Sequence, residues 1–314
     1  MRPEVALIKT GDVKAGLAEA WRLLGGFLAG LAKGDTVLIK PNCTCARPPE
    51  TGAGSDMRIA IELATLALSE GASAVLVAEG MGSGDNSLDE VRGIDELRTM
   101  GGVRVIDLND ERTRDVTVSN PLQVDRFAVP KVVLECDFFV NLAKLKVHPQ
   151  AGFSLAFKNL MGALPGRSYC DPEEARRQGY LTPIIPGGGK KVFHDLARDR
   201  GPEGMQNALV DLNTVIRSQL TVIDGLYGME GPGSPSRGKP VKMDLLIVST
   251  DIVAAEAVGA AVMGFDPAKM PYLGRAVERG LGSAYHLNEI TIKGADIDAV
   301  KRTFEPASAA AVWA

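Results

Sequence analysis

Residues 137–162 constrain the fold more than any other stretch, because the sequence there changes from a buried strand into a cluster of cations. The apolar run at 138–140 predicts a strand that is covered on both faces. Successive side chains of a strand point to opposite faces, so Lys144, Lys146 and His148 fall together on one face. The pattern predicts an anion-binding face at the end of an interior strand.

This row of positive groups also indicates what kind of ligand it would suit. At roughly 3.3 Å per residue the three side chains extend over about 13 Å, enough for an extended or doubly charged ligand. Two neighbouring ammonium groups disfavour the imidazolium, so the pKa of His148 should fall and its ring should be neutral and able to accept a proton. The alternative is that the lysines protect an edge strand from aggregation and that His148 is structural.

Short apolar runs alternate with segments of helical periodicity in the first part of the chain. Strands are expected near residues 5–9, 36–40, 74–79 and 103–107, with helices at 13–32, 57–69 and 88–100. This repetition predicts an α/β fold, a mostly parallel sheet with helices on both faces. We expect a single unit over residues 1–314, or alternatively two lobes, 1–125 and 126–314, around a cleft.

The pattern weakens between residues 109 and 130, which predicts a hairpin or a bridge between lobes. After the basic strand come a short helix at 153–161 and a polar segment reaching Asp199, which we interpret as a lid. Its glycine-rich run at 186–191 lacks the spacing of a phosphate-binding Walker loop. Helices are then expected at 205–219, 252–263 and 271–279, and strands at 220–224, 245–249 and 288–292.

Composition excludes several classes of partner. A formal net charge of −4 gives no footprint for nucleic acid or an anionic membrane. The longest apolar stretch, 245–265, is interrupted by Asp251 and Glu256, and charged residues break up residues 1–34. We therefore expect a cytoplasmic protein that neither spans a membrane nor carries a signal peptide. Its partner would be a small anionic substrate, and an oligomer remains open.

The cysteines do not form a recognisable cofactor motif. There are four of them, Cys43, Cys45, Cys136 and Cys170. Their spacing fits neither a disulfide framework, nor a zinc site, nor the repeated C-x-x-C of a ferredoxin. No cofactor is predicted. The alternative is a metal ion or iron–sulfur cluster, with ligands drawn from His148, His194, Cys43 and Cys45.

Polar residues follow nearly every expected strand. Ligands of open parallel sheets bind beyond the carboxyl ends of the strands. The residues found there include Lys40, Asn42, Glu79, Asp224 and Asp251. Together with the basic strand they predict a cleft of mixed charge, which acid–base chemistry requires.

Two further segments add candidates. In the expected helix after the basic strand, Lys158 and Asn159 fall on the side opposite the apolar residues, so both should point away from the core and could hold a carboxylate or phosphate. The alternative is a solvated helix face. The glycine-rich loop 227–234 after Asp224 is suited to close approach to a ligand, and it could bring Glu230 and Arg237 into the cleft.

Several ordered motifs resemble the DUF362 family over roughly residues 5–294. They are I-K-P-N, F-F-V-N-L-A-K-L-K-V-H, F-K-N-L-M-G, V-I-D-G with M-E-G-P-G, and D-I-V-A-A-E-A-V-G with M-G-F. The resemblance implies an α/β domain with motif residues at Lys40, Asn42, Lys144, Lys146, His148, Lys158, Asn159, Asp224 and Glu230. Many members carry a ferredoxin-type cysteine module, which this chain lacks, and Glu256 stands where the family pattern has Asp.

These features favour an enzyme that acts on a small carboxylate- or phosphate-bearing metabolite by isomerisation, elimination or addition. The catalytic candidates are His148, Lys146, Lys40, Asp224 and Glu230. The residues expected to hold the substrate are Asn42, Lys144, Lys158, Asn159 and Arg237. One alternative is a redox protein that uses a metal or an iron–sulfur partner. The other is a protein that binds an anion without transforming it.

Overall fold

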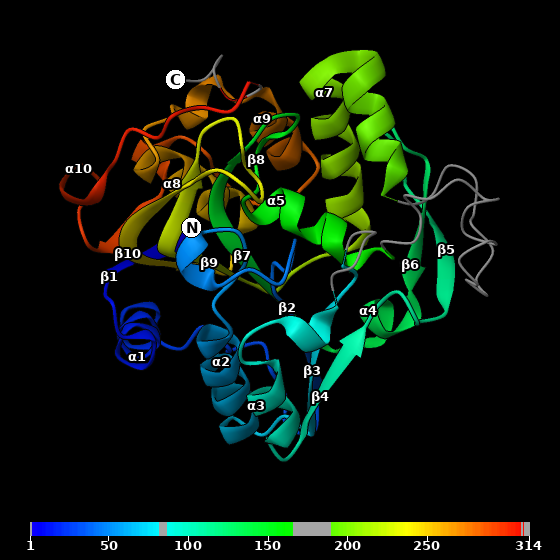
Figure 1. Ribbon diagram of the computed structural model, residues 1–314, viewed down its shortest axis with the longest axis vertical. Coiled ribbons are helices and arrows are strands. Elements are labelled where there is room, and N and C mark those ends of the chain that lie inside the picture. The colour runs from blue at the N-terminus through cyan, green and yellow to red at the C-terminus, as the bar shows by residue number, and fades with distance from the viewer. Residues whose placement is uncertain (1, 82–86, 166–189, 309, 311–314) are drawn as a thin grey trace.

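The computed structural model describes residues 2–81, 87–165, 190–308 and 310, which form a central mixed sheet with helices around it (Figure 1). The strands are β1 (Glu4–Lys9), β2 (Thr36–Lys40), β3 (Ala74–Glu79), β4 (Val103–Asp107), β5 (Thr113–Thr117), β6 (Arg126–Pro130), β7 (Phe138–His148), β8 (Gly152–Phe153), β9 (Leu220–Glu230), β10 (Lys239–Ser249) and β11 (Thr291–Gly294). The nine-stranded sheet has the order β11-β1-β10-β9-β7-β2-β3-β4, and β8 pairs with β7.

Most neighbouring strands of this sheet are parallel. β2 runs parallel to β3 and β7, β3 to β4, β7 to β9, and β1 to β11. β10 is antiparallel to both β1 and β9, and its pairing with β9 follows from the short connection at 231–238 that returns the chain from β9. The mostly parallel sheet expected from the sequence is therefore confirmed. β5 and β6 pair separately as an antiparallel hairpin.

Helices cover both faces of the sheet, also as expected. They are α1 (Val13–Leu24), α2 (Met57–Ser69), α3 (Ile94–Thr99), α4 (Lys131–Glu135), α5 (Ala156–Asn159), α7 (Lys191–Val215), α8 (Ile252–Val262), α9 (Pro271–Glu278) and α10 (Ile297–Val300). One apolar cluster packs under α1, α2 and α3, which lie in the lower part of Figure 1, and a second packs under α5, α7, α8 and α9 in the upper part. The division into one unit or two lobes stays a prediction.

β7 is the central strand, and all eleven of its residues are buried. Phe139 and Leu145 belong to the cluster under α5 and α8, whereas Phe138 and Leu142 belong to the cluster under α1 and α2. Beyond Leu142 the second face changes character, because the next side chains on that side are cations. The expected interior position of this strand is confirmed.

Several expected segments differ from the sequence prediction. The expected helix at 13–32 ends at Leu24, and the glycine-rich loop expected at 227–234 is strand as far as Glu230, where β9 ends. The expected helix at 153–161 is shorter, because its first residue lies in β8 and α5 passes into a 3₁₀ turn, η3 (Leu160–Ala163). Part of the expected lid is helical, because α7 already begins at Lys191. This helix is kinked at Gly201, which has φ 66°, and at Pro202. Residues 166–189, which include Cys170 and most of the glycine-rich run, lie outside the described residues.

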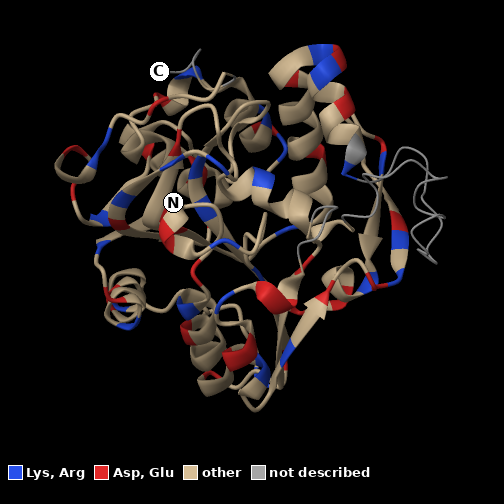
Figure 2. Ribbon diagram, viewed as in Figure 1, with Lys and Arg blue, Asp and Glu red and all other residues tan. Residues whose placement is uncertain are grey.

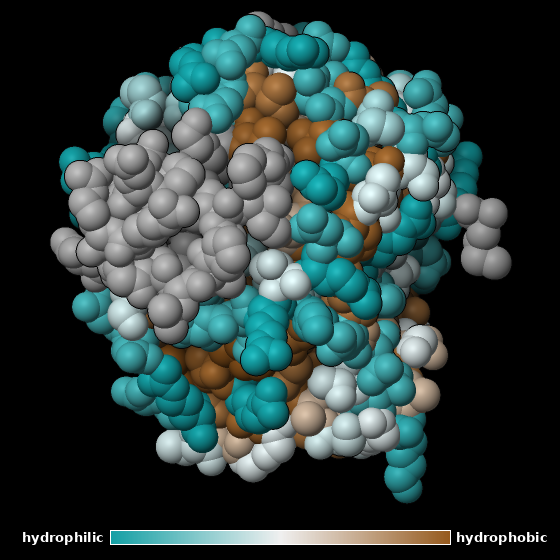
Figure 3. All heavy atoms as spheres, turned by 90° about the vertical axis from the view of Figure 1, so that its right-hand side faces the viewer, coloured by the Kyte–Doolittle hydropathy of each residue, from teal (hydrophilic) through white to brown (hydrophobic). Residues whose placement is uncertain are grey.

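Charges of both signs are interspersed around the molecule (Figure 2). On the face shown in Figure 3, apolar patches alternate with hydrophilic side chains. Among the helices of residues 2–81, 87–165 and 190–308, none is long and apolar enough to cross a membrane. Because the surface charges are mixed, a cavity with an excess of one charge indicates a binding site for a ligand of the opposite charge.

Candidate functional site

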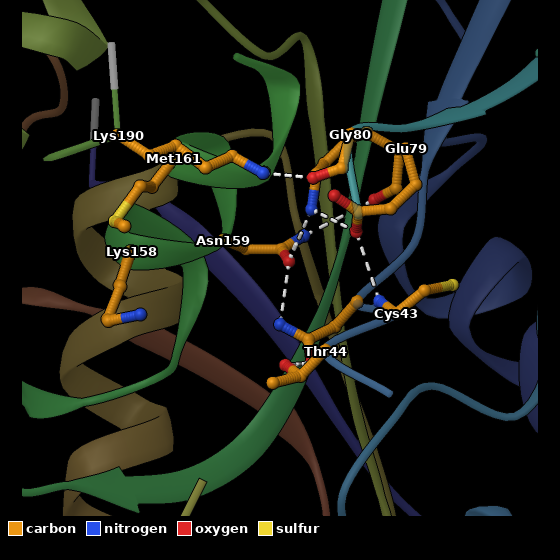
Figure 4. A pocket seen from close by; sticks show the side chains of 11 residues that line it. Cys43, Thr44, Glu79, Gly80, Lys158, Asn159, Met161 and Lys190 are labelled. Carbon is orange, nitrogen blue, oxygen red and sulfur yellow. Dashed lines mark hydrogen bonds and ion pairs between the residues drawn. The ribbon is translucent and has the colours of Figure 1, made fainter. Parts of the chain in front are cut away.

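A cavity of about 100 Å³ lies at the carboxyl ends of β2 and β3, beneath α5 (Figure 4). It is lined by Lys40, Asn42, Cys43, Thr44, Glu79, Gly80, Lys158, Asn159, Met161, Gly162 and Lys190. Three of these side chains are lysines and one is a carboxylate. The position is the one expected for a ligand of an open parallel sheet.

An ion pair between Lys40 and Glu79 forms the base of the cavity. The Lys40 Nζ donates to Glu79 Oε2 at 2.8 Å, and the two side chains are 1% and 4% exposed. The same ammonium donates to Asn159 Oδ1 at 2.9 Å and to the Pro41 carbonyl at 2.7 Å, so all three of its protons are used. The pair is rigidly held between the ends of two neighbouring strands. The sequence indicates Glu79 only as a polar strand end.

Asn159 joins the parts of the site. Its Oδ1 accepts from Asn42 Nδ2 at 2.9 Å as well as from Lys40, and its Nδ2 donates to Asn141 Oδ1 at 2.7 Å. The prediction that Asn159 points away from the core is wrong, since only 2% of it is exposed. α5 lies directly over the strand ends, so its polar side faces the polar edge of the sheet instead of solvent.

Lys158 and Lys190 supply the remaining positive groups. Lys158 is half-buried, and no hydrogen-bond or ion-pair partner of its ammonium group is found in the described part of the chain. Burial and the nearby Lys40 lower its pKa to about 8. Lys190 is buried, donates to the Gly80 carbonyl, and has its pKa lowered to about 7, mainly by burial. Sequence reasoning missed Lys190, because it lies in a glycine-rich run that carries no site motif.

Lys144 and Asp224, both fully buried, form a second ion pair at 2.8 Å. Asp224 also accepts from the backbone N–H of Asp56 at 2.8 Å and of Leu226 at 2.9 Å. Its carboxylate is thus saturated by internal donors, and neither residue lines the cavity. This geometry is that of a structural ion pair.

Lys146 is fully buried among uncharged oxygens. Its Nζ donates to Asn42 Oδ1 at 2.9 Å, to Thr44 Oγ1 at 3.0 Å and to the Ala53 carbonyl at 2.6 Å. Burial, followed by the charge of Lys158, lowers its pKa well below the ordinary value. Lys146 therefore holds the side chain of Asn42, which lines the cavity.

His148 is only 4% exposed, and its tautomer follows from its neighbours. Its Nδ1 accepts from the backbone N–H of Gln150 at 3.2 Å and of Ala151 at 3.1 Å. Burial and the charge of Lys158 hold its pKa well below 6.5, which agrees with the expected neutral ring. The ring proton therefore sits on Nε2, so this nitrogen would donate a hydrogen bond instead of accepting one.

Of the remaining candidates, Cys43 lines the cavity and the others do not. Arg237 is not among the residues that line it, and Glu230 accepts from the Glu305 backbone N–H at 2.8 Å. Of the alternative metal ligands, Cys43 is buried, with its thiol pKa raised by burial, and His194 Nδ1 lies 2.7 Å from the Gln150 side-chain oxygen. Among the described residues, no three His, Cys, Asp or Glu side chains are grouped to hold a metal ion, so the alternative set is not assembled.

Glu256 anchors the beginning of α5 from the neighbouring α8. Its Oε2 accepts from the Phe157 backbone N–H at 3.1 Å, and its Oε1 accepts from the Tyr272 hydroxyl at 2.8 Å. The side chain is 2% exposed, and burial raises its pKa to about 7. It therefore helps to position the helix that carries Lys158 and Asn159.

Comparison with known proteins gives a family, one protein similar in sequence and one similar solved structure. The model of a family described as "Domain of unknown function (DUF362)" matches residues 37–261. A thylakoid-associated protein of Synechocystis is 23% identical over 274 residues, which cover 87% of this chain and 77% of that protein. The lactate racemase apoprotein of Thermoanaerobacterium thermosaccharolyticum is similar over 82% of this chain and 57% of its own, with a TM-score of 0.42 and 16% identity.

Proposed function

The chain belongs to the DUF362 family, and from that premise we propose that it is an enzyme acting on a small carboxylate- or phosphate-bearing metabolite by lysine-assisted acid–base chemistry. The observation that carries this proposal is the cavity lined by Lys40, Lys158 and Lys190 against the single carboxylate of Glu79. Glu79 is already paired with Lys40, and Lys158, which has no ion-pair partner among the described residues, is placed to balance a bound anion. A charge excess of this kind favours an anionic ligand.

The lysines also supply a means of moving protons. With pKa values of about 8 and about 7, Lys158 and Lys190 change protonation near neutral pH. A base and an acid of similar strength in one cavity suit proton transfer at a carbon next to the anionic group. The proposal keeps the reaction classes expected from sequence, and it moves proton exchange from His148 to the two cavity lysines. His148 is not among the residues that line the cavity and has no part in the proposed proton transfer.

Anion binding is tested first with sulfate, by titration calorimetry on the full chain. Lys158→Gln and Lys190→Gln should each weaken sulfate binding about tenfold or more, because a charge-assisted hydrogen bond contributes about 1.5–3 kcal/mol. The matched control is Lys14→Gln, which makes the same charge change on the exposed side of α1. Equal loss in all three variants would contradict a local anion site.

Catalysis is tested separately by NMR, as the uptake of solvent deuterium into a panel of small carboxylates and phosphate esters. We expect exchange or conversion of at least one compound by the wild-type chain and by Lys14→Gln, and its loss in Lys158→Gln. Binding without any conversion across the panel would identify a non-catalytic anion-binding protein. A metal or a visible chromophore required for activity in anaerobically purified protein would support the redox alternative instead.

A further inference from the structure

The lysines around the cavity differ in whether their nitrogen lone pair can reach a ligand. Three are fully engaged inside the protein: Lys40 donates to three acceptors, Lys144 pairs with Asp224, and Lys146 donates to several uncharged oxygens. Lys190 is 4% exposed and donates to the Gly80 carbonyl. Lys158 alone among these five is half-buried, lines the cavity and has no internal acceptor within the described residues.

The position of Lys158 is that of a nucleophile more than of a structural cation. In Figure 4 no dashed line reaches the Lys158 side chain, whereas one connects Lys190 with Gly80 and others reach Glu79 and Asn159. Structural lysines in proteins are paired or solvated, whereas an amine beside other cations in a partly desolvated site is activated for attack on carbonyl groups. Burial and Lys40 lower its pKa to about 8, so a useful fraction is neutral at physiological pH.

We propose that Lys158 forms a covalent imine with a substrate that carries a ketone or aldehyde next to its anionic group, as in small 2-oxo acids. This deepens the proposed function and rests on its anion-binding cavity. Lys190 would balance the substrate's negative charge while the carbonyl carbon meets Lys158. A volume of about 100 Å³ suits a ligand of only a few non-hydrogen atoms.

The reaction needs no oxidant or reductant. The neutral Nζ of Lys158 attacks the carbonyl carbon and forms a C–N bond while the C=O electron pair moves to oxygen. One proton passes from nitrogen to that oxygen, and a second, supplied by solvent, protonates it as it leaves as water, giving the protonated C=N bond. The imine withdraws electrons from the carbon bonded to it on the side away from the anionic group, so a proton of that carbon becomes easier to remove.

The test is reductive trapping. The full chain is incubated with pyruvate or glyoxylate and sodium cyanoborohydride, whose hydride converts an imine into a stable secondary amine, and the adduct is located by peptide mass spectrometry. We expect one dominant adduct, at Lys158, in the wild-type chain and in Lys14→Gln. Lys158→Arg, which keeps the charge but not the nucleophile, should show at least tenfold less adduct.

Sulfate binding separates the two proposals. If Lys158→Arg still binds sulfate and loses the adduct, the anion site and the imine are both supported. In the wild-type chain, sulfate should also protect Lys158 from labelling, and this measurement needs no variant. If the wild-type chain binds sulfate but gives no adduct above that of exposed lysines, or if Lys158→Arg is labelled as strongly, the imine is overturned and the anion site remains. If the wild-type chain binds neither sulfate nor the oxo acids, both proposals fall.

Discussion

At the scale of single residues, the lysines near the cavity differ in the partners of their ammonium groups. Lys144 has a carboxylate partner and Lys146 has uncharged oxygens, whereas Lys158 keeps an open nitrogen among the described residues. Burying an ammonium without a carboxylate partner is unfavourable, and the lowered pKa of Lys146 expresses that cost. Groups with strongly shifted pKa values are concentrated at functional sites, so a buried lysine without a carboxylate partner beside the cavity supports the assignment of the site.

Sulfate affinity should depend on pH in a direction set by these lysines. Sulfate binds the protonated amines, so its affinity should be highest below pH 7 and fall as pH rises through about 7 and about 8, where Lys190 and Lys158 lose their protons. Sulfate itself does not titrate in this range. Calorimetry from about pH 6 to 9 measures the effect, about tenfold per pH unit for each ammonium lost.

Lys158→Arg is the matched variant for this profile. Arginine stays protonated, so the fall above pH 8 should become shallower while the fall near pH 7 remains. An affinity that is flat across the whole range in the wild-type chain would contradict the role of both lysines. A profile unchanged by Lys158→Arg would contradict the assignment of the upper step to Lys158.

At the scale of elements, the site is built where β2 and β3 end and where α5 and η3 pass over them. Gly162 in η3 lies against the central ion pair, because a Cβ at this position would overlap the Glu79 carboxylate and the Lys40 ammonium. Close approach of the turn to the strand ends therefore requires a residue without a side chain.

Gly162→Ala should displace the Lys40–Glu79 pair. We expect sulfate affinity to fall about tenfold and the free energy of unfolding to fall by about 1–3 kcal/mol, as for other overpacked interiors. Calorimetry and urea unfolding measure the two effects. Gly101→Ala is the control, since a Cβ there meets no atom within 4 Å. A Gly162→Ala chain that binds sulfate as tightly as Gly101→Ala would refute this packing.

The strand ends of the site are predictable from sequence, and the helix turn above them is not. Lys40 and Glu79 each end an apolar run, so the rule for parallel sheets places them at one edge from the sequence alone. The burial of Asn159 escapes prediction because helical periodicity reports which side is apolar, not what covers the polar side. Lys190 contacts Gly80, 110 residues away in sequence, and no local pattern encodes such a contact.

At the scale of the whole molecule, the two apolar clusters and the sheet between them follow from the βα repeat. The antiparallel return of β10 does not, because apolar runs do not specify the direction of pairing. One buried acid links global stability to the site: Glu256, which anchors α5. Its folded pKa of about 7 lies above the ordinary value of 4.5.

Glu256 should make the protein less stable as pH rises. Below about pH 4.5 the acid is protonated in both states; between 4.5 and about 7 only the folded state keeps the proton, so stability is lost over this window. The loss amounts to about 3 kcal/mol. Glu256→Gln resembles the protonated acid and should be less sensitive to pH in urea unfolding at pH 5 and 8. Glu62→Gln, a change on the outer side of α2, should follow the wild-type chain; an equal slope in Glu256→Gln would exclude this role.

The alternation of cations and aliphatic residues along the end of β7 also bears on how the chain finds its native state. A slide of one position against β2 and β9 would send Lys144 and Lys146 into the apolar layer and bring Leu145 and Val147 against Asp224 and Asn42. Each ammonium buried there without a partner would destabilise the misaligned sheet by several kcal/mol. The lysines near the cavity would thus disfavour a shifted register of β7 during folding, independently of any ligand.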